Sequence, residues 1–399
     1  MNFRIAFPRR VIFERGGVDR LPELLSDLSL DGRAMLVTGR RFARESGYLD
    51  KLRSLLVESG VKDVVVFDRV EPNPSAETVN KGGEIAKREG IDFVVGFGGG
   101  SAMDAAKGIA ILAAQGGKIS DYYYPADVNA PILPLIAIPT TCGTGSEVTK
   151  YAVISERSRK NVVVSDHIVP VAAILDAEVL KHLPKSILAH TAMDALSHAI
   201  EACFHVKASR LTEVFSAESA KLIFESFKPA YDGDPDHREK LLYASMLAGL
   251  AINLSGTVFV HGLGYYLTEK YRIPHGLANS LFLAQFIKYC SEKASERLLS
   301  LCGRIGIKSE ECSRVLAEKI NAMRRYAELP ANLREAGVPG EDFQNIVEQA
   351  LSYSRNIQNC VTPPSREDLE AIVKKAFEEE PKNSPRRRDA EGDNSRGVD

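Results

Sequence analysis

The sequence has little of three features that commonly reveal a protein's environment or partners. No apolar run in its 399 residues approaches the roughly 20 that a membrane-spanning helix needs. The N-terminal stretch MNFRIAFPRR lacks the apolar core of a signal peptide, so we expect a cytoplasmic protein. The formal net charge is only −2, which gives no general attraction to nucleic acids or anionic membranes. We therefore expect neither a membrane protein nor a nucleic-acid-binding protein.

Paired cysteines are also lacking, because none of the six cysteines belongs to a C-x-x-C motif. In a chain of this length, scattered cysteines are typical of reduced thiols that fill the core. They indicate neither a disulfide framework nor a zinc ribbon. We expect free thiols at positions 142, 203, 290, 302, 312 and 360.

The first half of the chain alternates between two patterns. Apolar, β-branched runs are separated by stretches with helical periodicity, and the runs cover 33–39, 61–68, 92–100 and 132–141. This alternation predicts a parallel sheet covered by helices on both faces. Shorter strand-like segments occur at 3–16, 151–155 and 171–176. We predict a Rossmann-like α/β nucleotide-binding domain over residues 1–184.

The second half reads almost entirely as helix. Apolar residues recur at helical spacing over 187–205, 210–228, 238–254, 277–290, 310–328 and 366–379. We predict an all-helical C-terminal domain over residues 185–379. The remaining residues, 380–399, are polar and lack apolar periodicity, so we predict a disordered tail.

Two loops follow buried strands of the predicted sheet and have the composition of phosphate-binding loops. The first, GFGGGSAMDAAK, allows close backbone approach at Gly98, Gly99 and Gly100, and its helix then starts beside Ser101. Asp104 and Lys107 add a polar pair one helical turn further on. A glycine-rich turn alone is weak evidence, because any tight strand-to-helix connection favours glycine.

The second loop, PTTCGTGSEVT, supplies hydroxyl groups at Thr140, Thr141, Thr144 and Ser146. Because both loops leave the carboxyl ends of parallel strands, we expect them to bind one elongated, phosphate-containing cofactor. The GxGxxG fingerprint is not present. The sequence therefore predicts a variant of the Rossmann binding scheme.

A set of metal ligands is predicted in the helical half. Asp194 and His198 stand at i, i+4 on one helix face, and His261 and His275 bound the segment HGLGYYLTEKYRIPH. The Asp–His pair alone would favour a simple hydrogen bond or a helix cap. With the two further histidines, the set offers one oxygen and three nitrogens, which suits Fe²⁺ or Zn²⁺.

Taken together, these motifs resemble the iron-containing (group III) alcohol dehydrogenase family. The matching stretches are GGGSAMDAAK, PTTCGTGSEVT, MDALSHAIEA and the segment ending in PHG, with weaker agreement at VEPNPS and VAAILDAEVL. The resemblance implies hydride exchange between a nicotinamide cofactor and an alcohol, with the four residues above as metal ligands. It also places Asn73 and Lys160 among the expected cofactor contacts.

One position departs from the family pattern. Many relatives have a histidine four residues after the ligand at 261, thought to relay a proton, and here the residue is Tyr265. A phenol with a pKa near 10 is a poor proton acceptor at neutral pH, so the relay is in doubt. Tyr265 could still hydrogen-bond to the substrate. His190 is expected to be structural or to support a metal ligand from behind, because many relatives carry a small residue there.

The residues at the end of the predicted strand 33–39 indicate which nicotinamide cofactor is preferred. Relatives hold the adenosine ribose with an aspartate, and this chain has Gly39 there, followed by Arg40 and Arg41. The missing carboxylate favours NADP(H) over NAD(H), and an arginine could pair with the extra phosphate. The alternative for the two arginines is that both are solvated loop residues.

The expected partners are a small, uncharged alcohol or aldehyde and a second copy of the chain in a dimer. Three other functions remain open on the same fold: a glycerol-type polyol dehydrogenase, a dehydroquinate-synthase-like lyase, and a non-catalytic nucleotide-binding protein. The lyase would need several Lys and Arg residues near the metal ligands, whereas only Lys185 and Lys207 flank the helix that carries Asp194.

Overall fold

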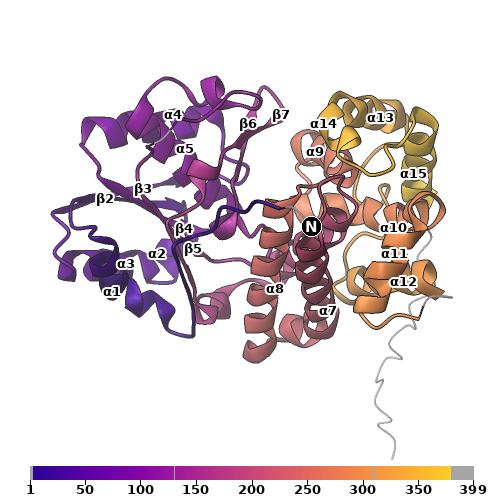
Figure 1. The fold of residues 1–399 in the computed structure, drawn as a ribbon, viewed down its shortest axis with the longest axis horizontal. Helices are drawn as coiled ribbons and strands as arrows, with labels where there is room; N and C mark the ends of the chain where they lie inside the picture. Colours follow the sequence, from indigo (N-terminus) through magenta and orange to yellow (C-terminus); the bar gives the residue numbers. More distant parts are fainter. Residues whose placement is uncertain (1–2, 130, 309–310, 379–399) are drawn as a thin grey trace, which may run out of the picture.

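The computed structural model describes residues 3–129, 131–308 and 311–378 (Figure 1). The tail predicted to be disordered, 380–399, lies outside the described residues. An α/β half and a helical half lie side by side in Figure 1, with the hairpin of β6 (Tyr151–Glu156) and β7 (Arg159–Val164) next to α9 (Phe259–Tyr271).

The α/β half contains one parallel sheet, as predicted. Its strand order is β1-β8-β5-β4-β2-β3, and every neighbouring pair is parallel. The strands are β1 (Arg10–Phe13), β2 (Arg33–Gly39), β3 (Asp63–Val70), β4 (Phe93–Gly98), β5 (Leu135–Pro139) and β8 (Ala172–Leu175). Parallel order brings the carboxyl ends of β4 and β5 to one edge, where the two predicted phosphate loops begin.

Helices cover both faces of this sheet. Along β2, Met35 and Val37 belong to one apolar core, whereas Ala34 and Leu36 belong to another, as period-two alternation requires. The first core includes α4 (Ala76–Arg88) and α5 (Gly100–Gln115). The second includes α1 (Leu21–Leu28), α2 (Phe42–Glu45) and α3 (Tyr48–Glu58).

The sequence did not predict the second strand of a small antiparallel hairpin. β6 (Tyr151–Glu156) coincides with the expected YAVIS strand, and β7 (Arg159–Val164) pairs with it. The charged stretch RSRKN masked the strand pattern of β7. The turn residues Arg157 and Ser158 both have positive φ, which a two-residue hairpin turn of this hand requires.

The helical half contains the six predicted helices with shifted ends. They are α6 (Lys185–Cys203), α7 (Arg210–Asp232), α8 (Pro235–Leu254), α10 (His275–Lys293), α12 (Cys312–Tyr326) and α15 (Arg366–Glu378). Four further helices were not predicted: α9 (Phe259–Tyr271), α11 (Ser295–Arg304), α13 (Phe343–Ser352) and α14 (Ser354–Gln358). α6 starts directly after Pro184, and the domain division at that point stays a prediction.

Helix α6 is the centre of the helical half. It packs against α7, α8 and α10, and nearly every residue from Leu188 to Cys203 is buried. A helix that is buried on all sides can place polar side chains in a water-poor interior. The predicted ligands Asp194 and His198 are therefore interior groups.

The expectation of six free thiols is wrong for two of them. Cys302 on α11 and Cys312 on α12 form a disulfide, with their Cα atoms 5.9 Å apart. Packing of the two helices brings the residues within bridging distance, and sequence spacing does not record that packing. Cys142, Cys203, Cys290 and Cys360 are free and buried, as expected.

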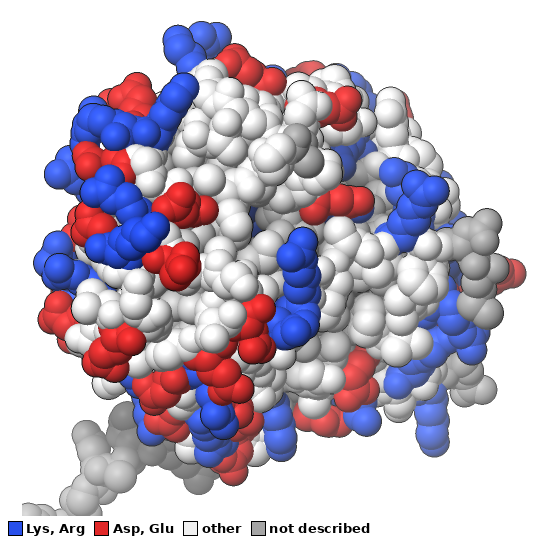
Figure 2. Space-filling model, turned by 60° about the vertical axis from the view of Figure 1, so that its left-hand side comes forward, with Lys and Arg blue, Asp and Glu red and all other residues white. Residues whose placement is uncertain are grey.

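The exposed surface carries both charge signs. In Figure 2, Lys and Arg side chains lie among Asp and Glu side chains along the left and lower margins, and much of the middle of this face is uncharged. Among the described residues, no single helix is long and apolar enough to cross a membrane; α8 and α9 reach that criterion only as a pair, bent by 114°.

A buried carboxylate anchors α9, the helix that carries His261. Asp342 accepts hydrogen bonds from the Tyr266 and Tyr271 hydroxyls at 2.7 and 2.5 Å and from the Lys270 ammonium at 2.8 Å. Asn345 of α13 donates a further bond at 2.6 Å. Burial alone would raise the pKa of Asp342, but these hydrogen bonds outweigh it and hold the pKa well below its usual range.

Asp342→Ala should therefore lower the free energy of unfolding by about 1–2 kcal/mol, because two half-buried tyrosine hydroxyls lose their shared acceptor. The carboxylate stabilises the fold only while it is ionised, so its contribution is present above the unfolded-state pKa of about 3.9 and is lost as pH falls through the lower folded-state pKa. Urea denaturation at pH 7 and at progressively lower pH measures this. A stability difference between wild type and variant that grows on acidification would contradict it.

Candidate metal and cofactor site

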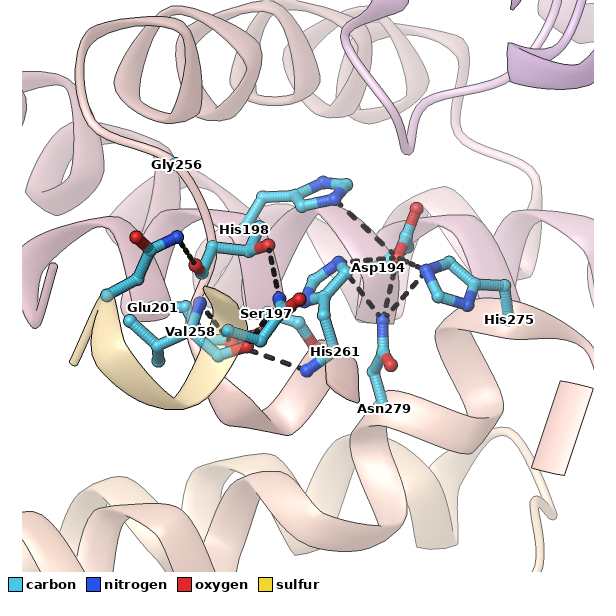
Figure 3. A network of polar contacts seen from close by, with 12 residues as sticks. Asp194, Ser197, His198, Glu201, Gly256, Val258, His261, His275 and Asn279 are labelled. Atoms are coloured by element: carbon cyan, nitrogen blue, oxygen red, sulfur yellow. Dashed lines mark hydrogen bonds and ion pairs between the residues drawn. The ribbon is translucent and has the colours of Figure 1, made fainter. Parts of the chain in front are cut away.

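Three imidazoles converge on one carboxylate oxygen inside the helical half. The Nε2 atoms of His198 and His261 each lie 4.0 Å from Asp194 Oδ1, and His275 Nε2 lies 3.8 Å from it. The ligand atoms of Asp194, His261 and His275 all lie within 4.8 Å of one another. Figure 3 shows these side chains pointing toward a common centre. The structure thus brings Asp194, His261 and His275 into one cluster, with His198 next to it, 4.0 Å from Asp194.

Three helices supply this cage. α6 carries Asp194 and His198 one turn apart, His261 lies in the first turn of α9, and His275 is the first residue of α10. The start of α10 packs very closely on α6: a Cβ atom at Gly276 would lie 1.9 Å from the His190 carbonyl oxygen. Glycine at 276 therefore allows His275 to approach Asp194. His190 contributes its backbone carbonyl to this contact, and the role of its side chain stays a prediction.

Each imidazole is oriented by a partner at its other nitrogen. His198 Nδ1 donates to the Gly143 carbonyl at 3.2 Å, and His261 Nδ1 donates to Glu201 Oε1 at 2.5 Å. His275 Nδ1 lies 3.4 Å from Thr268 Oγ1, whose own hydrogen goes to the Gly264 carbonyl. With Nδ1 protonated in this way, Nε2 keeps its lone pair for a metal.

The ionisation states also suit a cation. Burial lowers the pKa of His198 to about 4 and that of His275 to about 3, so both are neutral at pH 7. Burial alone would lower the pKa of His261, but the neighbouring Glu201 carboxylate outweighs burial, so that this pKa is raised. Burial would raise the pKa of Asp194, yet the surrounding histidines lower it, so this carboxylate is ionised. The cage therefore offers one anionic oxygen and three imidazole nitrogens.

Asn279 was not predicted and lies against the same centre. Its amide nitrogen is 3.2 Å from Asp194 Oδ1, 3.3 Å from His261 Nε2 and 3.2 Å from His275 Nε2. The amide oxygen is buried without a hydrogen-bond partner among the described residues. The convergent lone pairs of Asp194 and the imidazoles fit a divalent cation, and the mixed O/N set suits Fe²⁺ or Zn²⁺.

The two predicted phosphate loops lie against each other. A Cβ atom at Gly99 would be 3.2 Å from the Thr141 side chain, and one at Gly100 would be 2.5 Å from that of Thr144. Gly145 has a left-handed φ of 59° and packs on the backbone of Gly249 in α8. Thr140 is tied to β4 through its amide, which donates to the Gly98 carbonyl at 3.0 Å. One ligand can therefore contact both loops.

Three residues expected to contact the cofactor are hydrogen-bonded to one another and to the second loop and β6. Lys107 is fully buried, and its ammonium donates to Ser146 Oγ at 2.9 Å and to the carbonyls of Thr149 and Tyr151 at 2.9 and 2.7 Å. Asp104 accepts from Ser146 Oγ at 2.7 Å and from the Val153 amide at 2.9 Å. Asp104, Lys107 and Ser146 thus support the second loop, because their face of α5 is turned toward β6.

Three other predicted cofactor contacts form one polar chain. The Asn73 amide donates to Ser101 Oγ at 3.0 Å, and Asn73 Oδ1 accepts from the Lys160 ammonium at 2.7 Å. Lys160 is also 3.1 Å from Glu269 Oε1 on α9, a residue that the sequence did not single out. This chain runs from the first phosphate loop to the helix that carries His261.

The end of β2 is open, as expected for the adenosine side. A Cβ atom at Gly39 would meet only the Val70 carbonyl, at an ordinary 3.7 Å. Arg40 is exposed, with Nε donating to the Arg69 carbonyl at 3.2 Å and a guanidinium nitrogen 3.9 Å from Glu71. Its guanidinium is therefore partly engaged by protein oxygens.

Tyr265 lies beside the metal cage. Its ring stacks on that of His275, with centroids 5.5 Å apart and planes 11° apart, and it meets the Tyr353 ring at 5.1 Å. Burial raises the pKa of Tyr265, so the phenol stays protonated at neutral pH. Within the described ranges, its hydroxyl makes no hydrogen bond, which leaves it free for a ligand.

Sequence reasoning missed the residues that orient the ligands. Glu201 follows His198 by three positions on the same face of α6, and this buried acid within HAIEAC is a signal that could have been used. Thr268 and the Gly143 carbonyl gave no such signal, because their contacts depend on tertiary packing.

Comparisons with known proteins agree with this arrangement. The family model described as "Iron-containing alcohol dehydrogenase" matches residues 8–177. The model described as "Fe-containing alcohol dehydrogenase family, C-terminal" matches residues 188–377. The NADPH-dependent butanol dehydrogenase of Clostridium saccharobutylicum is 31% identical over 389 residues, covering 94% of this chain and 97% of that protein. The NAD-dependent methanol dehydrogenase of Bacillus methanolicus is 33% identical over 385 residues, covering 94% and 100%.

A solved structure extends the agreement to the whole fold. The alcohol dehydrogenase from Oenococcus oeni has a TM-score of 0.88 to this chain at 28% identity, covering 94% of this chain and 100% of that one. The chain belongs to the iron-containing alcohol dehydrogenase family. Its activity is that of an alcohol dehydrogenase that uses a nicotinamide cofactor and a divalent metal.

Glu201→Gln should weaken metal binding by roughly 10- to 100-fold, because the carboxylate that orients His261 is lost while all four ligands remain. Metal content and competition with a chelator measure this without reference to activity. His261→Ala is the positive control and should lose most of its metal. Unchanged metal affinity in Glu201→Gln would show that Glu201 does not orient the ligand.

Proposed function

We propose that this protein transfers hydride between NADP(H) and a small, uncharged alcohol/aldehyde pair. The single observation that carries the proposal is the convergence of a carboxylate and three imidazoles beside two cofactor loops. The proposed ligands of the divalent ion, Fe²⁺ or Zn²⁺, are Asp194, His198, His261 and His275.

A divalent ion in this cage supplies Lewis acidity toward an alcohol oxygen. The chain's own residues do the rest. Glu201, Thr268 and the Gly143 carbonyl hold the imidazoles in one tautomer, and the buried helices exclude water. In the oxidation direction, a hydride passes from the alcohol carbon to the nicotinamide. The alcohol oxygen loses a proton.

Tyr265 donates a hydrogen bond to the substrate oxygen in this proposal and is not the base. Its hydroxyl makes no hydrogen bond to any residue that the structure describes, and burial keeps it protonated at neutral pH. A donor at this place orients the oxygen while the proton leaves by another route. The uncharged substrate is supported by the aromatic rings of Tyr265 and Tyr353 next to His275.

Tyr265→Phe should leave metal content unchanged and lower kcat modestly, by less than the roughly 10²-fold typical of a general acid–base group. The measurement is steady-state kinetics over a panel of short alcohols and aldehydes. Tyr265→His should introduce a new titrating group into the pH profile of kcat/KM. A loss of 10²-fold or more in Tyr265→Phe, on the same general acid–base scale, would assign Tyr265 to proton transfer instead.

The NADP(H) preference is supported by the end of β2. A relative named for NADPH and one named for NAD are both similar to this chain, so family membership leaves the choice open. Gly39 presents neither bulk nor negative charge to a 2′-phosphate, and Arg40 and Arg41 follow it directly. Arginine pairs well with phosphate because its planar donors match the oxygens.

Gly39→Asp should shift the ratio of kcat/KM for NADPH over NADH toward NADH by about tenfold or more, because a carboxylate repels the 2′-phosphate. The space around Gly39 accepts a side chain, so the fold should be unaffected. A melting temperature equal to that of wild type is the control. If the wild-type protein uses NADH as well as NADPH, the proposed preference is wrong.

A dimer is the proposed assembly. β1 lies at the edge of the sheet and, among the described strands, pairs only with β8. Such an edge offers unpaired backbone groups to another chain. Phe3 and Phe7, which precede it, are 54% and 48% exposed. Analytical ultracentrifugation distinguishes a dimer from a monomer.

A further inference from the structure

A buried ion pair joins the hairpin β6–β7 to the helix of the metal cage. Lys160 of β7 and Glu269 of α9 are 3.1 Å apart, and their side chains are only 4% and 8% exposed. Ser155 Oγ donates to Glu269 Oε1 at 3.0 Å and lies 3.0 Å from the Lys160 ammonium. With Asn73 Oδ1 at 2.7 Å, the three hydrogens of the ammonium all have acceptors.

This pair lies near the reacting end of the site. On α9, His261, Tyr265 and Glu269 follow one another at four-residue intervals and therefore share one face. The Lys160 amide donates to the Tyr353 hydroxyl at 3.2 Å, and the Tyr353 ring contacts that of Tyr265. Hydride transfer requires the nicotinamide beside the alcohol carbon, so Lys160 lies toward the nicotinamide half of the cofactor.

Stability alone does not account for such a pair. Desolvation of two charges offsets most of their attraction, and apolar residues of similar volume often stabilise a fold equally well. What the pair does provide is a fixed geometry. The contacts run from Glu269 through Lys160 and Asn73 to Ser101, the second residue of α5, beside the phosphate loop.

We propose that Glu269 is a positioning residue for the nicotinamide half of the cofactor. It acts through Lys160, which it holds between the metal helix and the Asn73 loop, so that the cofactor is aligned with the metal cage. This role uses the nicotinamide-linked activity of the family and does not depend on the proposed preference for NADP(H).

A double-mutant cycle on purified, metal-loaded protein tests this proposal. The variants are Glu269→Leu, Lys160→Met and their combination, which replaces the pair by apolar side chains of similar size. The readouts are the Kd values for NADH and NADPH. Glu269→Leu should raise both Kd values roughly tenfold in the wild-type background, as expected for directly coupled residues. It should have no effect in the Lys160→Met background.

Two further readouts separate positioning from a general structural role. Binding of an adenosine-half fragment, AMP or 2′,5′-ADP, and metal content should be unchanged in Glu269→Leu. Lys270→Met is the matched control. It removes a neighbouring ion pair of α9, in which Lys270 Nζ lies 2.8 Å from Asp342 Oδ1. This control should lose stability without losing cofactor affinity. If Glu269→Leu does not fold, Glu269→Gln takes its place in the cycle.

Equal cofactor affinity in wild type and Glu269→Leu would overturn the proposal, as would the same loss in both backgrounds. Parallel loss of fragment binding would overturn it too, because the effect would then not belong to the nicotinamide half. A wild-type protein that binds metal but neither nicotinamide cofactor would instead contradict the proposed function.

Discussion

The site depends on one constraint: an ionised carboxylate, Asp194, lies in the interior of an apolar helical domain. A buried charge is costly unless it is compensated by hydrogen bonds, opposite charge or a metal. Here Asn279 of α10 donates a hydrogen bond to Asp194 Oδ1 at 3.2 Å, and imidazole lone pairs from α6, α9 and α10 face the same oxygen, which is an arrangement that a cation would complete. The close packing at Gly276 is what allows this convergence.

Residues that orient the proposed metal ligands and cofactor contacts also connect the α/β half of the site to its helical half. The Gly143 carbonyl belongs to the cofactor loop and orients His198, and Glu269 belongs to the metal helix and holds Lys160. Asp104 and Lys107 stiffen the same loop from behind. Catalysis by orientation requires errors well below 1 Å, which isolated loops rarely maintain.

The sequence predicted what depends on local spacing. Asp194 and His198 were found because four-residue spacing sets one helix face, and the parallel sheet because its strands are continuously apolar. Helix α5 shows the limit: the spacing of Asp104 and Lys107 tells that they share a face, but not that this face meets β6. For the same reason Asn279, Glu269 and the Cys302–Cys312 disulfide escaped notice, since only tertiary packing brings their partners near.

The hydrogen bond from His198 to the Gly143 carbonyl has a thermodynamic consequence. It couples a proposed metal ligand directly to the backbone of a loop proposed to contact the cofactor. If an ion at His198 favours one arrangement of that loop, then the affinity for the cofactor changes, and by reciprocity the cofactor changes the affinity for the ion by the same factor. In a cell short of metal, the nucleotide pool would thus help to decide how much of the enzyme keeps its ion.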